Sequence, residues 1–232
     1  MRIICDFDGT ISRRDTTDLV LETLAGPGWT ELEDQWLAAK ITAAECMRGQ
    51  VALIGGDRAA LDAVLDSVEL DAGFLDFVAW CEARDLPVSI VSDGVDYFIG
   101  RILARHGLER LPVISNELVG EPGAWALEQP WAEAGCAAGS GVCKCAATGL
   151  RGRTPPPKAT TVYVGDGRSD FCIAGRADIL FAKDKLADYA SARAQPYHPF
   201  ETFHEVTATL AALMGETAAE AALAAARAAA AR

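Results

Sequence analysis

Two carboxylates separated by a single residue stand near the start of the chain, at Asp6 and Asp8. They follow the apolar segment 3–5, which is typical of a short buried strand, and they precede Gly9, which favours a turn. Because such a turn lets both side chains approach one small volume, their like charges would repel unless a divalent cation lay between them. The sequence therefore predicts an acidic metal site at the end of the first strand.

Two later apolar segments, 87–91 and 161–164, also read as buried strands that end in polar residues. The residues that follow these two segments are Ser92, Asp93, Gly94, Asp166 and Asp170. Ligands bind at the carboxyl ends of strands in open α/β sheets, so we expect all of these residues to lie at one edge.

The order of these motifs resembles the haloacid dehalogenase superfamily of phosphotransferases, in particular its phosphoserine-phosphatase-like branch. The motifs are Asp6-Phe7-Asp8-Gly9-Thr10, Ser92-Asp93-Gly94, Lys144 and the segment 165–170. The resemblance implies a Rossmann-like parallel sheet with a small inserted cap. It also implies that Asp6 is the nucleophile that forms an aspartyl-phosphate, and that Asp8 protonates the leaving group and then activates water.

The same resemblance implies a Mg²⁺ cofactor. Its ligands would be the carboxylates of Asp6 and Asp166 and the backbone carbonyl of Asp8, an oxygen shell that suits this ion. Asp170 would either hold a metal-bound water or orient Lys144.

Phosphate oxygens are expected to meet the hydroxyl of Ser92 and the backbone amides of Asp93 and Gly94, at the start of the next helix. The carboxylate of Asp93 either faces the substrate or caps that helix, and the sequence leaves both roles open.

Two lysines precede Asp166, and only one can stand beside the nucleophile. Lys158 lies eight residues ahead (166 − 158), which predicts a place at the foot of the strand. Lys144 lies 22 residues ahead (166 − 144), enough for a short helix and a returning strand. We therefore expect Lys144 to be the catalytic cation.

Helical and strand patterns alternate after residue 71, which indicates an α/β fold with a parallel sheet. Residues 1–14 and 71–215 are predicted to form this core, and the helical pattern of 15–70 a cap that closes over the site. Segment 120–153 is expected to be a loop with little regular structure. The alanine-rich residues 216–232 are expected to be a frayed helix or a mobile tail.

Asp15 stands at the entrance to the expected cap. Relatives in the phosphoserine-phosphatase branch place an acid there that reads the substrate amine, so the resemblance implies a substrate-selecting role. Asp15 is also a plausible helix N-cap, and the sequence leaves both roles open.

A net charge of −12 disfavours nucleic acid and anionic membranes as partners. Hydrophobic residues make up 50% of the chain, yet no uncharged apolar run is long enough to span a bilayer. The first strand begins at Arg2 and leaves no room for a signal peptide, so a cytoplasmic protein acting on a small phosphorylated metabolite is expected. The sequence does not indicate an oligomeric state.

Within the superfamily the chain most resembles the methionine-salvage phosphatases that act on 2-hydroxy-3-keto-5-methylthiopentenyl-1-phosphate. The segment 4–11, the cap's tryptophans and the cysteines near Lys144 carry this likeness. Residues 167–172 are closer to phosphocholine and phosphoethanolamine phosphatases, and phosphoserine is a further candidate substrate. A phosphomutase and a binding protein without turnover remain alternatives.

Seven cysteines without secretory context suggest reduced thiols. Cys136, Cys143 and Cys145 either hold a structural Zn²⁺ or line a loop. Their spacing lacks a CxxC pair and no histidine lies nearby, which favours the loop.

Overall fold

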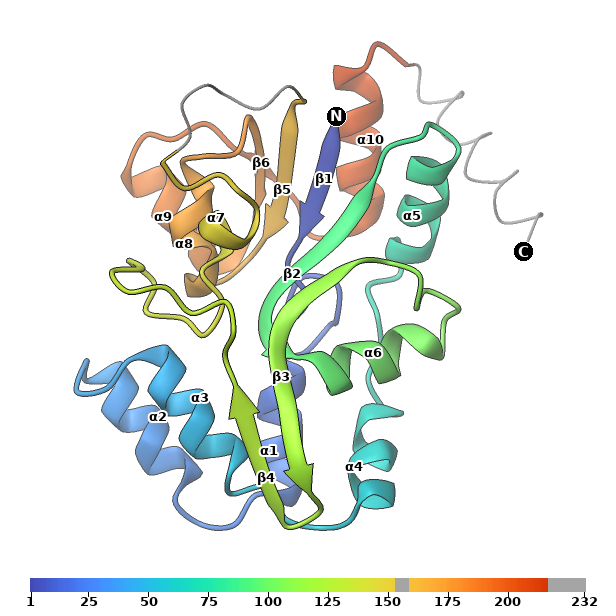
Figure 1. The fold of residues 1–232 in the computed structure, drawn as a ribbon. Helices are drawn as coiled ribbons and strands as arrows, with labels where there is room; N and C mark the ends of the chain where they lie inside the picture. The colour runs from blue at the N-terminus through green and yellow to red at the C-terminus, as the bar shows by residue number, and fades with distance from the viewer. Residues whose placement is uncertain (153–158, 217–232) are drawn as a thin grey trace.

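The computed structural model describes residues 1–152 and 159–216, and its centre is a seven-stranded sheet in the order β4-β3-β2-β1-β5-β6-β7 (Figure 1). All neighbouring strands are parallel except the pair β3–β4. The strands are β1 (Arg2–Cys5), β2 (Val88–Val95), β3 (Val113–Glu121), β4 (Ala124–Glu128), β5 (Thr161–Gly165), β6 (Ile179–Ala182) and β7 (His198–Pro199). The predicted α/β fold with a parallel sheet is confirmed.

Strand β1 lies at the middle of the sheet because it carries apolar side chains on both faces of the sheet. Ile3 and Cys5 face one hydrophobic cluster, whereas Ile4 faces the other together with Tyr163 of β5. Burial on both faces is typical of a central parallel strand. The register pairs Ile4 with Ser89 and Tyr163, so β1, β2 and β5 run side by side toward the same edge.

Helices cover both faces of the sheet (Figure 1). One cluster is filled from α5 (Phe74–Glu82), α6 (Asp96–Ala104) and α10 (Phe203–Leu213), and the other from α7 (Lys144–Ala147), α8 (Phe171–Ala174) and α9 (Asp184–Ala192). Rings hold α5 and α10 together, since Phe203 lies 4.9 Å from Phe74 and 5.0 Å from Phe77 between centroids. In the described part of the chain, no helix is long and apolar enough to cross a membrane.

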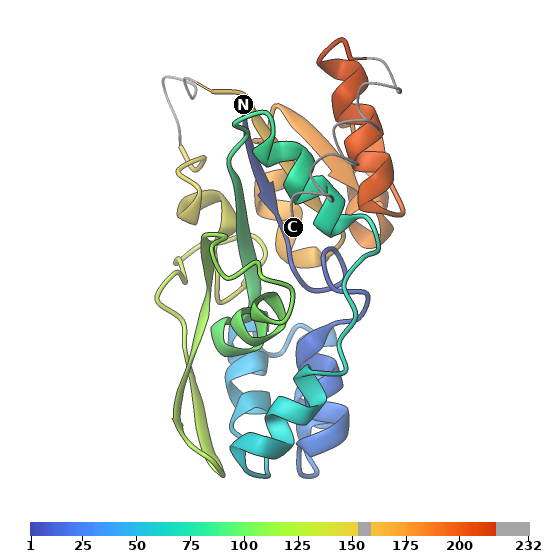
Figure 2. The same ribbon diagram turned by 90° about the vertical axis from the view of Figure 1, so that its right-hand side faces the viewer.

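Four helices between β1 and β2 lie beyond the carboxyl ends of the strands (Figures 1 and 2). They are α1 (Thr16–Leu24), α2 (Trp29–Leu37), α3 (Ala43–Val51) and α4 (Arg58–Leu65). Side chains at Asp15, Thr42 and Asp57 cap the amino ends of α1, α3 and α4. The sequence predicts a cap in this segment, and the division into core and cap stays a prediction.

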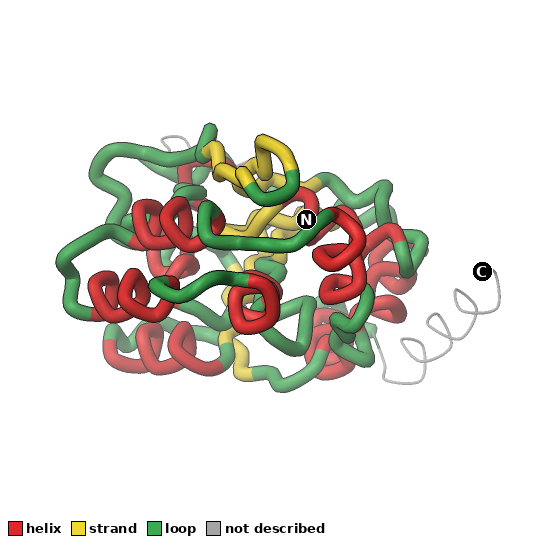
Figure 3. Tube along the Cα trace, turned by 90° about the horizontal axis from the view of Figure 1, so that it is seen from below, coloured by secondary structure: helices red, strands yellow, loops and turns green. Residues whose placement is uncertain are grey.

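A β-hairpin replaces part of the loop that was expected over residues 120–153, so that expectation was wrong. Strand β3 continues to Glu121 and pairs with β4, with Gly120 opposite Trp125. Trp125 and Leu127 are buried while their neighbours are exposed, a period of two that the glycine- and alanine-rich surroundings conceal. The hairpin packs against α3, and Figure 3 shows it along one side of the four helices.

Strand β2 is also longer than expected. It was predicted to end at Ser92, but it continues to Val95, and α6 begins only at Asp96. Lys158 and the alanine-rich residues 217–232 lie outside the described residues.

Candidate active site

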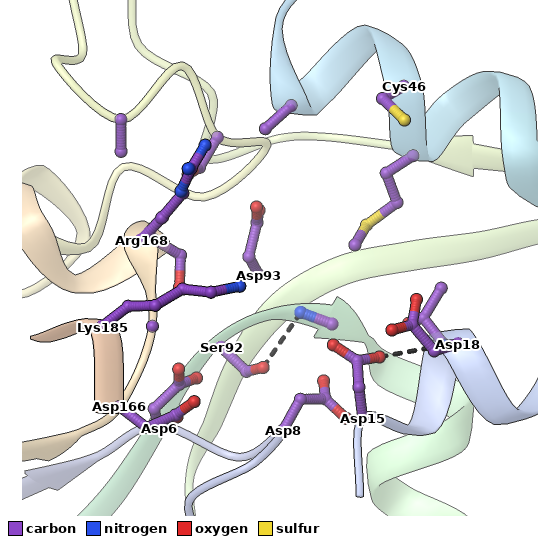
Figure 4. Close-up of a pocket in the computed structure, with 18 of the residues that line it drawn as sticks. Asp6, Asp8, Asp15, Asp18, Cys46, Ser92, Asp93, Asp166, Arg168 and Lys185 are labelled. Atoms are coloured by element: carbon purple, nitrogen blue, oxygen red, sulfur yellow. Dashed lines mark hydrogen bonds between the residues drawn. The ribbon is translucent and has the colours of Figure 1, made fainter. Parts of the chain in front are cut away.

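A cavity of about 650 Å³ opens where β1, β2 and β5 end against helices α1, α2 and α3 (Figure 4). Most of the predicted site residues line it: Asp6, Asp8, Asp15, Ser92, Asp93, Gly94 and Asp166. The remaining two, Lys144 and Asp170, are fully buried and lie directly behind Asp6. The structure therefore brings all nine residues together.

Lys144 begins the short helix α7, and its ammonium lies between two carboxylates. The Nζ atom is 2.8 Å from Oδ2 of Asp6 and 2.6 Å from Oδ1 of Asp170. Burial lowers the pKa of Lys144, but Asp170 and Asp6 raise it by more, so the pKa lies above its ordinary value. Lys144 is therefore a fixed positive charge beside Asp6.

Asp170 uses both carboxylate oxygens in hydrogen bonds. The hydroxyl of Tyr163 donates to Oδ1 at 2.5 Å, and the backbone amides of Asp166 and Gly167 donate to Oδ2 at 3.0 and 2.9 Å. These contacts favour the role that orients Lys144 over the role that holds a metal-bound water. Tyr163 was not identified from the sequence, because it looks like an ordinary core residue of β5.

Asp6 continues the ladder beyond β1, since its amide donates to the carbonyl of Val164 at 2.9 Å. The amide of Phe7 donates to Oδ1 of Asp6 at 2.7 Å. Burial and the nearby charge of Asp170 raise the pKa of Asp6 well above its usual range, although Lys144 lowers it. The carboxylate is thus aimed by its backbone and by Lys144.

Asp166 stands at the end of β5, where the hydroxyl of Thr10 donates to its Oδ1 at 2.5 Å. Burial and the charge of Asp170 raise its pKa to about 6. Oxygens of Asp6, Asp166 and Asp170 all lie within 4.8 Å of one another. A buried cluster with more carboxylates than cations and only oxygen donors fits Mg²⁺.

Asp8 is held by the first turn of α1. The backbone amide and the hydroxyl of Thr16 donate to Oδ1 of Asp8 at 2.8 and 2.6 Å. Burial raises the pKa of Asp8 even though the bonds from Thr16 lower it. The upward direction of this pKa shift is the one that suits a general acid.

Glycines leave room for these carboxylates. Gly9 has φ of +71°, and a Cβ there would lie 2.7 Å from Oδ2 of Asp166. A Cβ on Gly94 would collide with the side chain of Asp8. Both glycines therefore allow close approach within the site.

Asp93 ties β2 to the segment that carries Lys144. Its Oδ1 accepts from the amide of Val142 at 2.8 Å and from Nδ2 of Asn116 at 3.3 Å. It does not cap α6, whose N-cap is Val95, so the capping role considered from the sequence is wrong. Ser92 accepts a hydrogen bond from the amide of Gly94 at 2.9 Å, which sets the turn of the backbone beneath the cavity.

Asp15 does cap its helix, because Oδ1 accepts from the amide of Asp18 at 3.0 Å. It also lines the cavity, on the side of Asp8 (Figure 4). Asp15 can therefore cap α1 and also contact the substrate, and its substrate-selecting role stays a prediction.

The outer wall of the cavity was not predicted. Glu33 and Trp36 reach it from α2, and Cys46, Met47 and Gln50 from α3. Gln50 donates to Glu33 at 3.2 Å. The helical pattern of this segment shows which residues are apolar but not which ones face the ends of the strands.

Across the cavity from this wall lie Arg168 and Lys185 (Figure 4). The guanidinium of Arg168 lies 5.6 Å from the centroid of the Trp36 ring. This cation–π contact joins the segment after β5 to helix α2 across the mouth of the cavity.

Comparison with known proteins identifies the family of the chain. Residues 3–175 match the model of the haloacid dehalogenase-like hydrolases. The chain is 30% identical over 211 residues to 2-hydroxy-3-keto-5-methylthiopentenyl-1-phosphate phosphatase of Brevibacillus brevis, covering 88% of this chain and 92% of the relative. The protein of the same name from Geobacillus kaustophilus is 31% identical over 212 residues, with the same coverage.

Solved structures support the same fold. A HAD family hydrolase from Salmonella enterica aligns with a TM-score of 0.69 at 21% identity, covering 89% of this chain and 69% of that one. A substrate-bound phosphoserine phosphatase aligns with a TM-score of 0.61 at 18% identity, covering 81% and 89%. The chain therefore belongs to the haloacid dehalogenase-like hydrolase family and is a phosphatase.

Proposed function

We propose that the protein is a Mg²⁺-dependent phosphomonoester hydrolase that works through an aspartyl-phosphate on Asp6. The observation that carries this proposal is the placement of Asp6. Its carboxylate lies on the cavity lining, aimed by the Phe7 amide and by Lys144, with Asp8 on the same lining. A positioned nucleophile and a separate proton donor are what a two-step displacement requires.

In the first step an oxygen of Asp6 attacks phosphorus, and the bond from phosphorus to the substrate oxygen breaks. Asp8 gives its proton to that departing oxygen. In the second step Asp8 takes a proton from water as the water attacks phosphorus, and the bond between phosphorus and Asp6 breaks. Phosphate leaves, and both carboxyl groups return to their starting states.

Lys144 acts on both steps because its charge faces Asp6 from a water-excluded position. It favours the ionised form of Asp6 and stabilises negative charge that develops on the phosphoryl group. Mg²⁺, held by Asp6, Asp166 and the carbonyl of Asp8, would supply further positive charge beside the phosphoryl oxygens. The hydroxyl of Ser92, whose oxygen accepts from the Gly94 amide, borders the same space and is the proposed phosphate contact.

We assign 2-hydroxy-3-keto-5-methylthiopentenyl-1-phosphate as the substrate, because relatives named for it align with 88% of this chain at 30% and 31% identity. The wall suits the end of that molecule remote from its phosphate. Met47, Cys46 and Trp36 offer soft, apolar surface, which favours a methylthio group.

An amine-bearing phosphomonoester, such as phosphoserine, phosphoethanolamine or phosphocholine, is the second candidate. The observation that favours it is the charge of the cavity, where acidic side chains outnumber the two basic ones, Arg168 and Lys185. Asp15 and Asp18 lie on the side away from Asp166 (Figure 4), Glu33 also lines the cavity, and these carboxylates would attract an ammonium group.

A phosphate-release screen with Mg²⁺ tests both levels of the proposal. The panel contains the methylthio ketone phosphate, the three amine-bearing esters and neutral sugar phosphates, with Asp6→Asn as the blank. We expect the highest kcat/KM for the methylthio substrate. A higher value for an amine-bearing ester would replace the substrate and leave the reaction intact, whereas binding without release of phosphate from any ester would refute the hydrolase.

A further inference from the structure

Four of the seven cysteines gather on one face of the sheet, outside the cavity of the proposed reaction. The sulfurs of Cys136, Cys143 and Cys172 lie within 4.8 Å of one another. Cys145 joins them, because its sulfur is 3.6 Å from that of Cys143 and it also interacts with the thiol of Cys172. Cys172 comes 27 residues after Cys145 (172 − 145), so the cluster was not apparent from the spacing of the first three.

The sulfurs of Cys136, Cys143 and Cys172 are close enough together to share one metal ion, and Cys145 reaches this group through its contact with Cys143. With metal–sulfur bonds of about 2.3 Å, two ligands of a tetrahedral zinc ion lie about 3.8 Å apart. The pair Cys143–Cys145, at 3.6 Å, already has nearly this separation, and all seven cysteines are free. Soft sulfur donors select Zn²⁺ over Mg²⁺, so this cluster and the carboxylates of the cavity would take different ions.

The surroundings of the cluster suit a closed, structural metal site. Cys143 and Cys145 are buried, and Cys136 and Cys172 pack against the same hydrophobic cluster. The positive charge of Arg151 favours the thiolate form of Cys143, and that of Arg176 favours the thiolate form of Cys145. Arg176 would offset part of the negative charge of a four-thiolate zinc centre, whereas Arg151 is also paired with Glu133 at 3.2 Å.

The segment that carries these cysteines has little regular structure. Between the end of β4 and residue 152, its one helix among the described residues is α7, which is four residues long. Hydrogen bonds from Arg176 to the carbonyls of Cys172 and Leu150 join it to α8 at 3.1 and 3.5 Å. A metal cross-link would stabilise this segment where regular structure does not.

We propose that Cys136, Cys143, Cys145 and Cys172 bind one structural Zn²⁺. Binding replaces the thiol protons, which pass to solvent, with four sulfur–zinc bonds. Cys143 and Cys145 flank Lys144, and Cys172 lies two residues after Asp170. The ion therefore joins the two segments whose side chains form the Lys144–Asp170 ion pair, and it holds the catalytic lysine in place.

Metal content of the full-length protein tests the site directly. We expect one zinc per chain after purification with reductant and dialysis against excess Mg²⁺, and the same content in Asp166→Asn, which weakens only the carboxylate site. Replacement by Co²⁺ should produce the sulfur-to-cobalt charge-transfer absorption of a tetrahedral thiolate centre. Absence of zinc after reconstitution, its loss in Asp166→Asn, or iron with sulfide in its place would overturn the proposal.

Single cysteine variants give the second arm. Cys136 is only half-buried, so Cys136→Ser should fold, as far-UV circular dichroism can verify, and should bind zinc at least about tenfold more weakly. Cys81→Ala, a buried cysteine of α5 outside the cluster, is the matched control and should keep its zinc. A strong chelator should lower the Tm of the wild-type chain and change that of Cys136→Ser much less. Equal zinc affinity in Cys136→Ser and wild type would contradict the site.

Discussion

The inner and outer ends of the cavity are built differently. The inner end, which we call the floor, comprises Asp6, Lys144, Asp166 and Asp170, and its polar groups are buried and joined by short hydrogen bonds and ion pairs. The outer wall comprises Glu33, Trp36, Cys46, Met47 and Gln50, and its contacts are fewer and longer, such as 3.9 Å from Cys46 to Glu33.

This difference assigns catalysis to the floor and the selection of the substrate to the wall. The floor stands on the ends of β1 and β5 and on the segments that follow them, where many contacts fix each group in one position. The wall stands on α2 and α3, and no residue of α2 is buried. Changes in the floor should therefore reduce turnover of every substrate, whereas changes in the wall should alter the ranking of substrates.

The largest effect is expected for Asp6→Asn, which removes the nucleophile. Phosphate release should fall by about 10⁴-fold or more for every substrate. The fold should persist because Lys144 keeps Asp170 as its partner, and circular dichroism with a phosphate assay measures both. Removal of Mg²⁺ by chelation should abolish release in the same way, and full activity without the ion would contradict the assigned cofactor.

Lys144→Met should lower kcat by about 10²- to 10³-fold, because the transition state loses a preorganised charge. The same change leaves two buried carboxylates without their cation, so the free energy of unfolding should fall by about 3–5 kcal/mol. Lys158→Ala is the control, and the spacing of the sequence predicts little loss there. A larger kinetic loss in the control would reverse the choice of lysine.

The pH dependence of stability should reveal the floor carboxylates. In metal-free protein the pKa of Asp166 is raised to about 6, above its value in the unfolded chain. At pH values between these two pKa values, the folded state therefore binds more protons than the unfolded state. Stability should therefore decline as pH rises from about 4 to 6, by about 2 kcal/mol from this group. Denaturant titrations of wild type and Asp166→Asn at several pH values measure the contribution. The same dependence of the free energy of unfolding on pH in both proteins would exclude it.

The smallest effects are expected at Asp15, on the side of the cavity opposite Arg168 and Lys185 (Figure 4). Asp15→Asn should keep the cap of α1, since asparagine caps as well as aspartate, but it removes the charge. We expect amine-bearing esters to lose about tenfold in kcat/KM relative to neutral esters. An unchanged ranking would leave Asp15 with the capping role alone.

The floor was predictable because its chemistry follows directly from the chain. Asp6 and Asp166 come straight after apolar strands, and parallel strands carry such residues to one edge. The wall was not predictable, because the orientation of α2 and α3 depends on packing between helices and the β3–β4 hairpin. That hairpin was itself missed, since the alternation of Trp125 and Leu127 spans only a few residues.

Asp93 and Cys172 show the same limit in single residues. Asp93 was expected at a helix start, but the extension of β2 places it against the amide of Val142 instead. Cys172 was not included in the cysteine group considered from the sequence, and only the return of the chain through β5 brings it to Cys143. Contacts made across the sheet cannot be read from local spacing.

The most direct test of the account is to trap the phosphorylated enzyme. Asp8→Asn removes the acid and base, and an aryl phosphate with a good leaving group can still react in the first step because it needs no proton. After acid quench, mass spectrometry of Asp8→Asn should show one phosphoryl group per chain, located by peptide mapping at Asp6 and absent from the Asp6→Asn/Asp8→Asn protein. A phosphoryl group on another residue, or turnover of the aryl phosphate in that double variant, would contradict the central claim.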